Sequence, residues 1–357
     1  MFAKKPTRIA LAIAAVLGLS ISGCNDDDTT SNNNNEDPAV SMTFNRAASF
    51  LVCSQLDANC DVDTETVSEI VAASEDGMTL IYSDSPNQAI GFVDITDPSA
   101  PNGLGTLAMS GEPTSVAVLG DYAVVGVNTS ADYINTSGHL SVVDIATQKE
   151  ITTIDLGGQP DAVSVSKDGA YIAIAIENER DEDLGDGAPP QMPAGYLSVV
   201  SVEDATDPST WTVSKVEMTG LQGMLYADDP EPEYVDINED NIAVVTLQEN
   251  NHVVLVDLAA GEITNHFSFG SVDLTQVDAT EEDPAIIAQT ESLDAVLREP
   301  DGVTWIGTEH FATANEGDLD GGSRGFSIFS TDGDVVYDSG NTLDHIVASL
   351  GHYPDGR

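Results

Sequence analysis

Five short strand-like segments recur along the chain, and they constrain its fold more than any other feature. Their first residues are separated by 50, 57, 56 and 73 residues. From Ser41 onward, short runs of alternating apolar residues are broken by turn residues, with almost no helical periodicity. Repeats of this length, with four strands in each, are typical of β-propeller blades. We therefore expect an all-β propeller with YVTN- or WD40-like blades in residues 41–357. The five segments are AIGFVDI from Ala89, HLSVVDI from His139, YLSVVSV from Tyr196, HVVLVDL from His252 and GFSIFST from Gly325.

Five blades are predicted within residues 67–340, and the flanking segments are expected to complete the pattern. Residues 42–52 are predicted to form a strand that joins the last blade, because closing the ring removes exposed strand edges. Residues 341–357 are expected to start a sixth blade that ends without its final strand. Between the fourth and fifth blades, residues 284–297 are predicted to form a short amphipathic helix.

A second repeat places side-chain oxygens at the same point of successive blades. Proline-containing turns with an acidic residue precede the first strands, and the second strands end in acidic or amide residues. Because first strands line the axis of a propeller, these oxygens are expected to form a ring. Calcium takes six to eight such oxygens, so the repeat predicts a calcium site in the central channel. The candidate ligands are Asp161, Glu177, Asn178, Glu233, Glu249, Asn250, Asp301, Asn315 and Glu316.

The same repeat has a purely structural interpretation, which stays open here. Acidic and amide side chains at turns often cap the backbone N–H groups where a strand begins. If the carboxylates do crowd around an axis, their pKa values are expected to be raised unless a cation neutralises them.

Other motifs offer weaker indications of chemistry. Hydrolysis of a phosphate ester would use a metal ion to polarise the phosphoryl group, and Arg298 and Arg324 are the candidate catalytic residues for it. The alternative is that these arginines pair with neighbouring acids. Residues 321–325 match the GxSxG pattern by letter but lead into a strand, so we interpret the match as chance. The acidic, proline-rich insertion at 180–194 departs from the EF-hand spacing and is expected to be a solvated loop.

The N-terminus has the features of a secretion signal. Lys4, Lys5 and Arg8 precede an apolar stretch at residues 9–19, and the segment ending at Cys24 resembles a bacterial lipobox. We expect residues 1–23 to be a lipoprotein signal peptide, Cys24 to be acylated, and residues 24–40 to form a flexible tether. The membrane, contacted through this lipid anchor, is therefore a predicted partner.

The remaining cysteines agree with an extracytoplasmic location. Cys53 and Cys60 are seven positions apart, and a disulfide is expected between them in an oxidising compartment. The alternatives are two free thiols or a metal pair, although no further Cys or His lies nearby in the sequence to complete a zinc site.

The charge of the chain limits its partners. With 61 acidic and 11 basic residues, the formal net charge is −50. Nucleic acid and anionic lipid surfaces are therefore implausible electrostatic partners. A ligand in the extracellular or periplasmic space remains unspecified.

Three segments resemble a known family. FATANEGD from Phe311, REPDGV from Arg298 and GHYPDGR from Gly351 are similar to the choice-of-anchor I proteins, bacterial surface propellers related to mesenchyme-specific cell-surface glycoprotein. The resemblance covers roughly residues 41–357, and ANEGD is its most specific part. Members are often labelled alkaline phosphatase or esterase-like phytase, which implies phosphoesterase activity. The family continues beyond the PDGR position, which implies a C-terminally truncated chain here.

These observations predict a cell-envelope lipoprotein that faces the periplasm or the cell exterior. We expect an extracytoplasmic β-propeller with a calcium-binding axial site that acts as a surface binding or scaffold module. The alternative is a calcium-dependent phosphoric monoester hydrolase or esterase, which requires a metal with an open coordination position beside Arg298 or Arg324.

Overall fold

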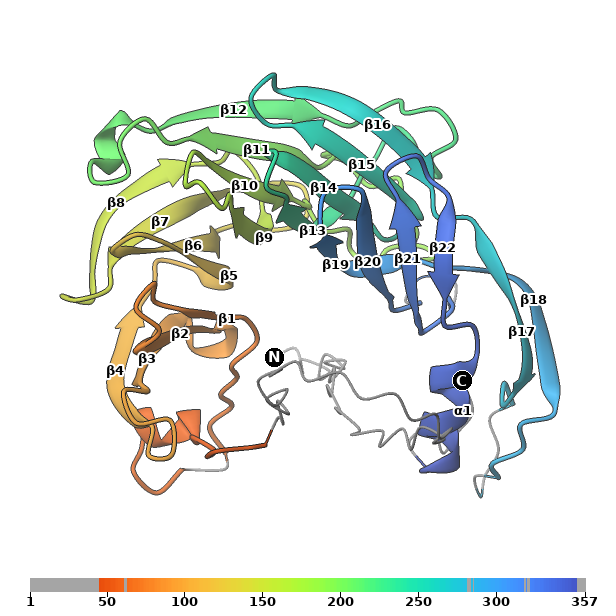
Figure 1. Cartoon of the computed structure of the whole chain (residues 1–357), viewed down its shortest axis with the longest axis horizontal. Helices are drawn as coiled ribbons and strands as arrows, with labels where there is room; N and C mark the ends of the chain where they lie inside the picture. The colour runs from red at the N-terminus through yellow and green to blue at the C-terminus, as the bar shows by residue number, and fades with distance from the viewer. Residues whose placement is uncertain are drawn as a thin grey trace, which may run out of the picture. The chain divides into compact units, whose positions relative to one another are not determined.

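The computed structural model describes residues 45–60, 63–280, 284, 286–317, 319 and 322–351. Clustering of contacts places residues 46–357 in one compact unit. The described residues contain 22 strands, which form five four-stranded antiparallel sheets and one two-stranded hairpin (Figure 1). The prediction of an all-β propeller with five blades is confirmed. The proposed signal peptide, Cys24 and the tether lie outside the described residues.

Each blade is a meander in which sequence order equals spatial order. The first blade contains β1 Val71–Ala73, β2 Thr79–Asp84, β3 Ala89–Asp94 and β4 Asn102–Ala108, and the second contains β5 Glu112–Leu119, β6 Tyr122–Asn128, β7 Gly138–Asp144 and β8 Lys149–Asp155. The third contains β9 Pro160–Val165, β10 Tyr171–Ile176, β11 Tyr196–Ser201 and β12 Thr212–Glu217. The fourth contains β13 Pro232–Ile237, β14 Ile242–Leu247, β15 His252–Asp257 and β16 Glu262–Ser268, and the fifth contains β19 Pro300–Ile306, β20 His310–Asn315, β21 Phe326–Ser330 and β22 Val335–Asp338.

The middle strands of the second, third and fourth blades are buried on both faces because each of these sheets packs between two others. In β10, Ile172, Ile174 and Ile176 join a core shared with the second blade. The alternate residues Ala173 and Ala175 join a core shared with the fourth blade. Side chains of a strand point alternately to opposite faces, so a fully apolar strand such as YIAIAI can contribute to two cores at once.

The fourth and fifth blades are held together by aromatic residues. Phe269, Phe311 and Phe329 are almost completely buried, and the rings of Phe269 and Phe329 meet edge to face with centroids 4.8 Å apart. Pairs of this kind contribute about 0.5–1.5 kcal/mol beyond the burial of their area. The outer strands are far more exposed, as expected for the polar rim of a propeller.

Close approach between neighbouring blades explains two glycines at or near the start of third strands. A methyl group at Gly138 would lie 2.3 Å from Cδ of Pro160, and one at Gly195 would lie 2.5 Å from Cδ of Pro232. Each proline begins the first strand of the next blade. Glycine is therefore required where the proline ring packs on the preceding blade.

The segment between the fourth and fifth blades contains a hairpin where a helix was predicted. β17 Ser271–Val277 pairs with β18 Glu291–Leu297, so the prediction for residues 284–297 is wrong over the stretch that forms β18. The sequence ESLDAVL satisfies helical spacing, but pairing with β17 supplies backbone partners that favour a strand. Short apolar runs are ambiguous in this way.

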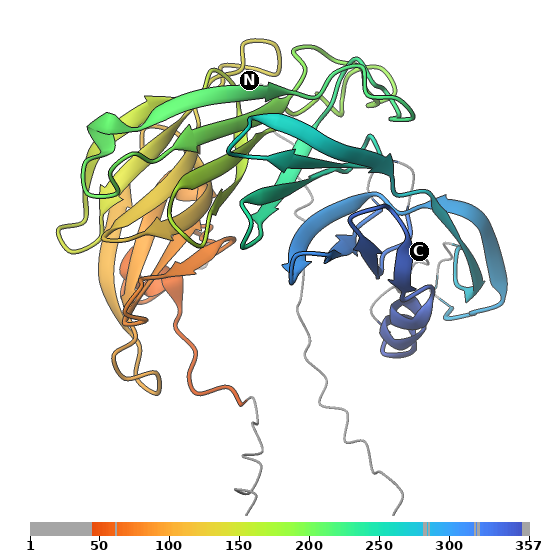
Figure 2. The same ribbon diagram turned by 45° about the horizontal axis from the view of Figure 1, so that its top comes forward.

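Both predictions for the ends of the domain need correction. Residues 45–51 contain no strand, and a short 3-10 helix follows at Val52–Gln55; two further 3-10 helices span Ser85–Asn87 and Pro208–Thr210. After the fifth blade the chain forms α1 Thr342–Ser349 rather than a strand of a sixth blade. Figures 1 and 2 show α1 beside the β17–β18 hairpin, and Nε2 of His345 lies 2.6 Å from the carbonyl oxygen of Gln276.

The predicted disulfide is confirmed. Cys53 and Cys60 are bonded, with their Cα atoms 5.0 Å apart. The bridge closes the segment that precedes the first blade, where Gln55 also accepts a hydrogen bond from the backbone N–H of Gly105 at 2.7 Å. The disulfide therefore stabilises a segment that is attached to the outer strand of the first blade.

Candidate functional site

In each of four successive blades, the first strand contains a β-bulge that redirects the side chain of one residue. In each case the register shifts directly after a proline, so that two residues of the first strand lie opposite one residue of the second. Such bulges bend a strand and redirect a side chain. The residues that follow the four prolines are Thr114, Asp161, Glu233 and Asp301.

Hydrogen bonds between blades fix the backbone of two of these acids. The hydroxyl of Thr114 donates to the carbonyl oxygen of Asp161 at 3.0 Å, and the hydroxyl of Thr246 donates to the carbonyl oxygen of Asp301 at 2.6 Å. The backbone positions are therefore set by the neighbouring blade, while the carboxylates remain available for other contacts.

Acids from separate blades lie close enough for their charges to affect one another. Burial raises the pKa of Asp161 to about 8, and the charge of Asp301 is the next cause. Burial also raises the pKa of Glu177 well above its usual value, followed by the charge of Asp161. The pKa of Asp301 is raised by burial and by the charge of Glu249. We call Asp161, Glu177, Glu233, Glu249 and Asp301 the axial carboxylates.

Glu233 of the fourth blade is also affected by a neighbouring acid. Burial raises the pKa of Glu233 well above its usual value, and the charge of Glu249 raises this pKa further. Carboxylates that lie this close repel one another when they are ionised, so a bound cation would stabilise their ionised forms.

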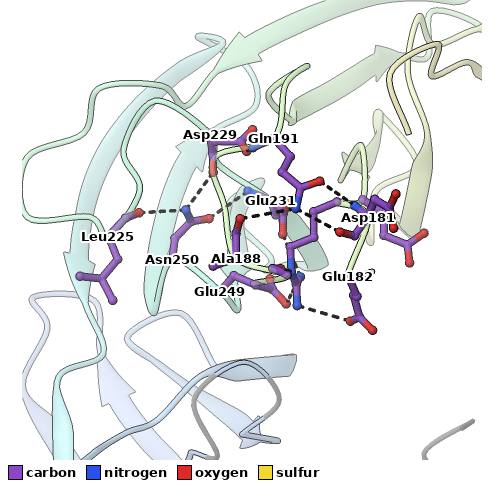
Figure 3. A network of polar contacts seen from close by, with 12 residues as sticks. Asp181, Glu182, Ala188, Gln191, Leu225, Asp229, Glu231, Glu249 and Asn250 are labelled. Carbon is purple, nitrogen blue, oxygen red and sulfur yellow. Dashed lines mark hydrogen bonds and ion pairs between the residues drawn. The ribbon is translucent and has the colours of Figure 1, made fainter. Parts of the chain in front are cut away.

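Arg180 supplies a positive charge beside Glu231 and Glu249, two of the residues labelled in the polar network of Figure 3. Its Nη1 lies 2.7 Å from Oε1 of Glu249 and 3.1 Å from Oε2 of Glu231. Its Nε donates to the carbonyl oxygen of Gly187 at 2.9 Å, and Nη2 lies 3.4 Å from the exposed Glu182. Burial would lower the pKa of Arg180, but the charges of Glu249 and Glu231 outweigh it and raise the pKa.

One arginine does not satisfy both buried glutamates. Glu231 is completely buried and Glu249 is 4% exposed. Oε1 of Glu231 and Oε2 of Glu249 have no hydrogen-bond partner within the described part of the chain. Burial and the charge of Glu249 raise the pKa of Glu231 to about 8, despite the opposing effect of Arg180. Buried oxygens of this kind require an explanation, such as a bound ion or water.

The side-chain amides predicted to bind a metal instead accept hydrogen bonds from nearby backbone or hydroxyl groups. Oδ1 of Asn178 accepts the backbone N–H of Gln159, and Oδ1 of Asn250 accepts that of Glu231, both at 2.9 Å. Oδ1 of Asn315 accepts the hydroxyl of Thr313 at 3.0 Å. The capping interpretation thus describes the contacts of these amides, whereas the ring of ligands expected from the carboxylates stays a prediction.

Arg298 is engaged in the fifth blade. Its Nε lies 2.7 Å from Oδ2 of Asp338, Nη1 donates to the carbonyl oxygen of Phe269 at 2.6 Å, and the guanidinium lies over the ring of Phe329. Arg324 is half-buried, and the candidate ligand Glu316 is exposed. The catalytic role suggested for the two arginines stays a prediction.

The insertion at 180–194 is more ordered than a solvated loop. Its side-chain and backbone groups are organised around the buried Arg180, and Gln191 donates its backbone N–H to Oδ2 of Asp229. Arg180 and Glu231 were not among the site residues predicted from the sequence. The available signal was one basic residue directly after the acidic end of β10, in a chain with only 11 bases.

No complete metal site is preformed among the residues that the structure describes. Within them, no group of three or more His, Cys, Asp or Glu side chains is placed to hold one metal ion. The carboxylates that raise each other's pKa values therefore lie near one another without meeting at a single point. The calcium site stays a prediction.

The comparisons with known proteins identify the family. The model of the choice-of-anchor I domain matches residues 69–321, which include all five axial carboxylates. The chain belongs to the choice-of-anchor I family. This choice-of-anchor I domain is accordingly a surface-associated β-propeller module. No curated protein sequence matches the chain.

Solved structures share the fold at low sequence identity. A chain of the mitotic checkpoint complex is 11% identical with a TM-score of 0.50, and the alignment covers 78% of this chain and 65% of that one. A protein of unknown function from Bacteroides caccae is 10% identical, with a TM-score of 0.45 and coverage of 77% and 82%. Hydrazine synthase from Kuenenia stuttgartiensis is 12% identical, with a TM-score of 0.39 and coverage of 75% and 84%.

Within the part of the chain that the structure describes, no helix has the length and apolar character needed to cross a bilayer.

Proposed function

We propose that the chain is a binding module of the cell envelope, anchored to a membrane through acylated Cys24 and carrying a calcium ion among its axial carboxylates. The observation that supports this proposal is the convergence of carboxylates from three blades, with Arg180 as the counter-charge beside them. A divalent ion would supply the remaining positive charge.

The chemistry of the donors suits calcium better than a softer metal. All five axial residues offer carboxylate oxygens, which calcium binds in flexible coordination. Because the glutamates among them have several rotatable bonds, Glu177, Glu233 and Glu249 can move toward an ion while the bulged backbone stays fixed. Bound calcium would favour the ionised form of these groups and lower their pKa values.

Calcium is expected to stabilise the protein through these residues. We expect added calcium to raise the free energy of unfolding of the chelator-treated, full-length protein in detergent, by about 2.7 kcal/mol at 100 times the dissociation constant. The increase should disappear in Glu233→Gln/Asp301→Asn and persist in Glu262→Gln, which changes an exposed acid of β16. Thermal unfolding and calorimetric titration measure the effect. Equal stabilisation of all three proteins would disprove the axial site.

An activity assay separates the binding module from the phosphoesterase alternative. A binding module gives no turnover of a chromogenic phosphomonoester at any calcium concentration. Calcium-dependent turnover that is lost in Glu233→Gln/Asp301→Asn would replace the proposal by a phosphoesterase using the same axial carboxylates.

The anchor is tested independently of the axial site. We expect Cys24→Ser to abolish incorporation of a labelled fatty acid and to shift the protein from the membrane fraction to the soluble fraction, since acyl chains supply the membrane affinity. Cell fractionation with metabolic labelling measures both effects. Unchanged labelling in Cys24→Ser would disprove acylation at this position.

A further inference from the structure

Three loops on the side of the axial carboxylates expose large apolar side chains. The loops join β6 to β7, β10 to β11 and β12 to β13. First strands begin and second strands end on this side of each blade, so the loops emerge beside the axial carboxylates. We call the six residues the apolar rim: Tyr133, Ile134, Leu184, Met192, Leu225 and Tyr226.

The three loops lie next to one another. The backbone N–H of Gly195 donates to the carbonyl oxygen of Pro230 at 2.8 Å, which joins the second loop to the third. The third loop is also tied to the end of β14, because Nδ2 of Asn250 donates to the carbonyl oxygen of Leu225 at 2.9 Å (Figure 3). Tyr133 lies close enough to the second loop for the charges of Glu179 and Asp181 to act on its hydroxyl group.

The side chains of the apolar rim are more exposed to solvent than apolar side chains usually are. Ile134 is 75% exposed, Leu184 is 59% exposed and Met192 is 56% exposed. Single exposed apolar residues are common, but several of them on adjacent loops around a charged centre are typical of a binding surface. Tyrosine and methionine are enriched at such surfaces.

The acidic residues at the centre of this surface can bind a further positively charged group. Oε2 of Glu249 is buried and has no hydrogen-bond partner in the described ranges, while its Oε1 contacts Arg180 at 2.7 Å. Arg180 shows that a guanidinium group fits between two carboxylates here. Glu177, Glu233 and Asp301 are acids of the same cluster, and their mutual repulsion would be relieved by a second cationic group.

We propose that this face binds a polypeptide segment of a partner, in which one arginine or lysine side chain enters the axial carboxylates and adjacent aliphatic or aromatic side chains pack on the apolar rim. The inference rests on the proposed binding function and names a class of partner for it, whose cationic side chain takes the place of the calcium ion among the axial carboxylates. Charge complementarity selects this class, because the chain has a net charge of −50 and a buried carboxylate pairs best with a donor of several hydrogen bonds.

The test uses a capped, fluorescent peptide of alternating leucine and arginine with the full-length protein in detergent. We expect Ile134→Ser/Leu184→Ser and Glu233→Gln/Asp301→Asn each to weaken binding at least about tenfold, and a peptide with serine in place of leucine to bind similarly weakly to the unaltered protein. Ile151→Ser/Val213→Ser is the matched control, because both residues are exposed on outer strands. It should bind as the unaltered protein does.

Several outcomes would overturn the proposal. Equal binding of the serine peptide, or unchanged binding by the rim variant, would show attraction by net charge alone. No binding of the leucine–arginine peptide by the chelator-treated protein would exclude this class of partner. Neither result affects calcium-dependent stabilisation, so failure of the partner assignment remains distinguishable from failure of the proposed function. The rim residues are exposed, so their substitution should leave thermal unfolding unchanged, which verifies that the variants fold.

Discussion

Replacing Arg180 with methionine is expected to lower the free energy of unfolding by about 3–5 kcal/mol at neutral pH. The substitution keeps a long apolar side chain but leaves Glu249 without its counter-charge and Glu231 without its hydrogen-bond donor. Both glutamates are almost completely buried, so water cannot replace the guanidinium. Urea unfolding followed by circular dichroism measures the loss.

An exposed ion pair provides the control for the Arg180→Met experiment. Lys167 lies 3.0 Å from Glu239, but both side chains are more than 60% exposed, and pairs of this kind contribute about 0–1 kcal/mol. Lys167→Met should therefore change stability little. A loss in Arg180→Met no larger than the loss in Lys167→Met would contradict the assigned role of the arginine.

A triple variant separates lost attraction from uncompensated charge. In Arg180→Met/Glu231→Gln/Glu249→Gln the buried charges are removed together, and most of the stability should return, since neutral groups do not incur the cost of burying an unpaired charge. Continued instability of the triple variant would indicate that packing of the arginine side chain, rather than its charge, maintains this part of the structure.

The fold was predictable because its determinants are local and repeated. Short apolar segments such as AIGFVDI return at blade-length intervals, which indicates strand identity and blade number together. The helix predicted at residues 284–297 failed where periodicity was ambiguous. There, pairing of β18 with β17 decided the outcome, and pairing between strands cannot be read from one segment alone.

The candidate site was predictable only in part. The proline–acid repeat drew attention to Asp161, Glu233 and Asp301, because a shared position in each blade becomes a shared position in space. Their role as ligands of one ion stays a prediction. The roles of Asn178 and Asn250 depended on which backbone N–H groups lie within reach. Such contacts are set by turn geometry, and the sequence pattern is identical for a cap and for a ligand.

Stability in the presence of a chelator is expected to fall as pH rises from about 6.5 to about 8. Burial and neighbouring charges raise the folded-state pKa values of Asp161 and Glu231 to about 8, whereas unfolded carboxyl groups titrate near pH 4. Between these values the folded state holds protons that the unfolded state has released. The free energy of unfolding therefore decreases by about 1.4 kcal/mol per pH unit for each such proton.

Below pH 6.5 a histidine partly offsets this decrease. Burial and the charge of His266 lower the pKa of His252 to about 4. Below pH 6.5 the histidine is therefore protonated in the unfolded state but not in the folded state. Taken by itself, this group makes the free energy of unfolding fall as pH decreases. Acids that accept hydrogen bonds in exposed turns, such as Asp168, have lowered pKa values and act only at still lower pH. Above pH 6.5 the raised carboxylates dominate.

Two variants test whether the axial carboxylates cause this dependence of stability on pH. Asp161→Asn/Glu233→Gln should flatten the decrease in stability between pH 6.5 and pH 8 and should be more stable than the unaltered protein at pH 8, since it removes groups that repel one another when ionised. Glu262→Gln, on the exposed edge of the fourth blade, should retain the slope. Chemical unfolding at a series of pH values measures both quantities. A slope that is the same in all three proteins would mean that the axial carboxylates are already ionised and balanced at neutral pH, and the need for an added cation at the axis would disappear.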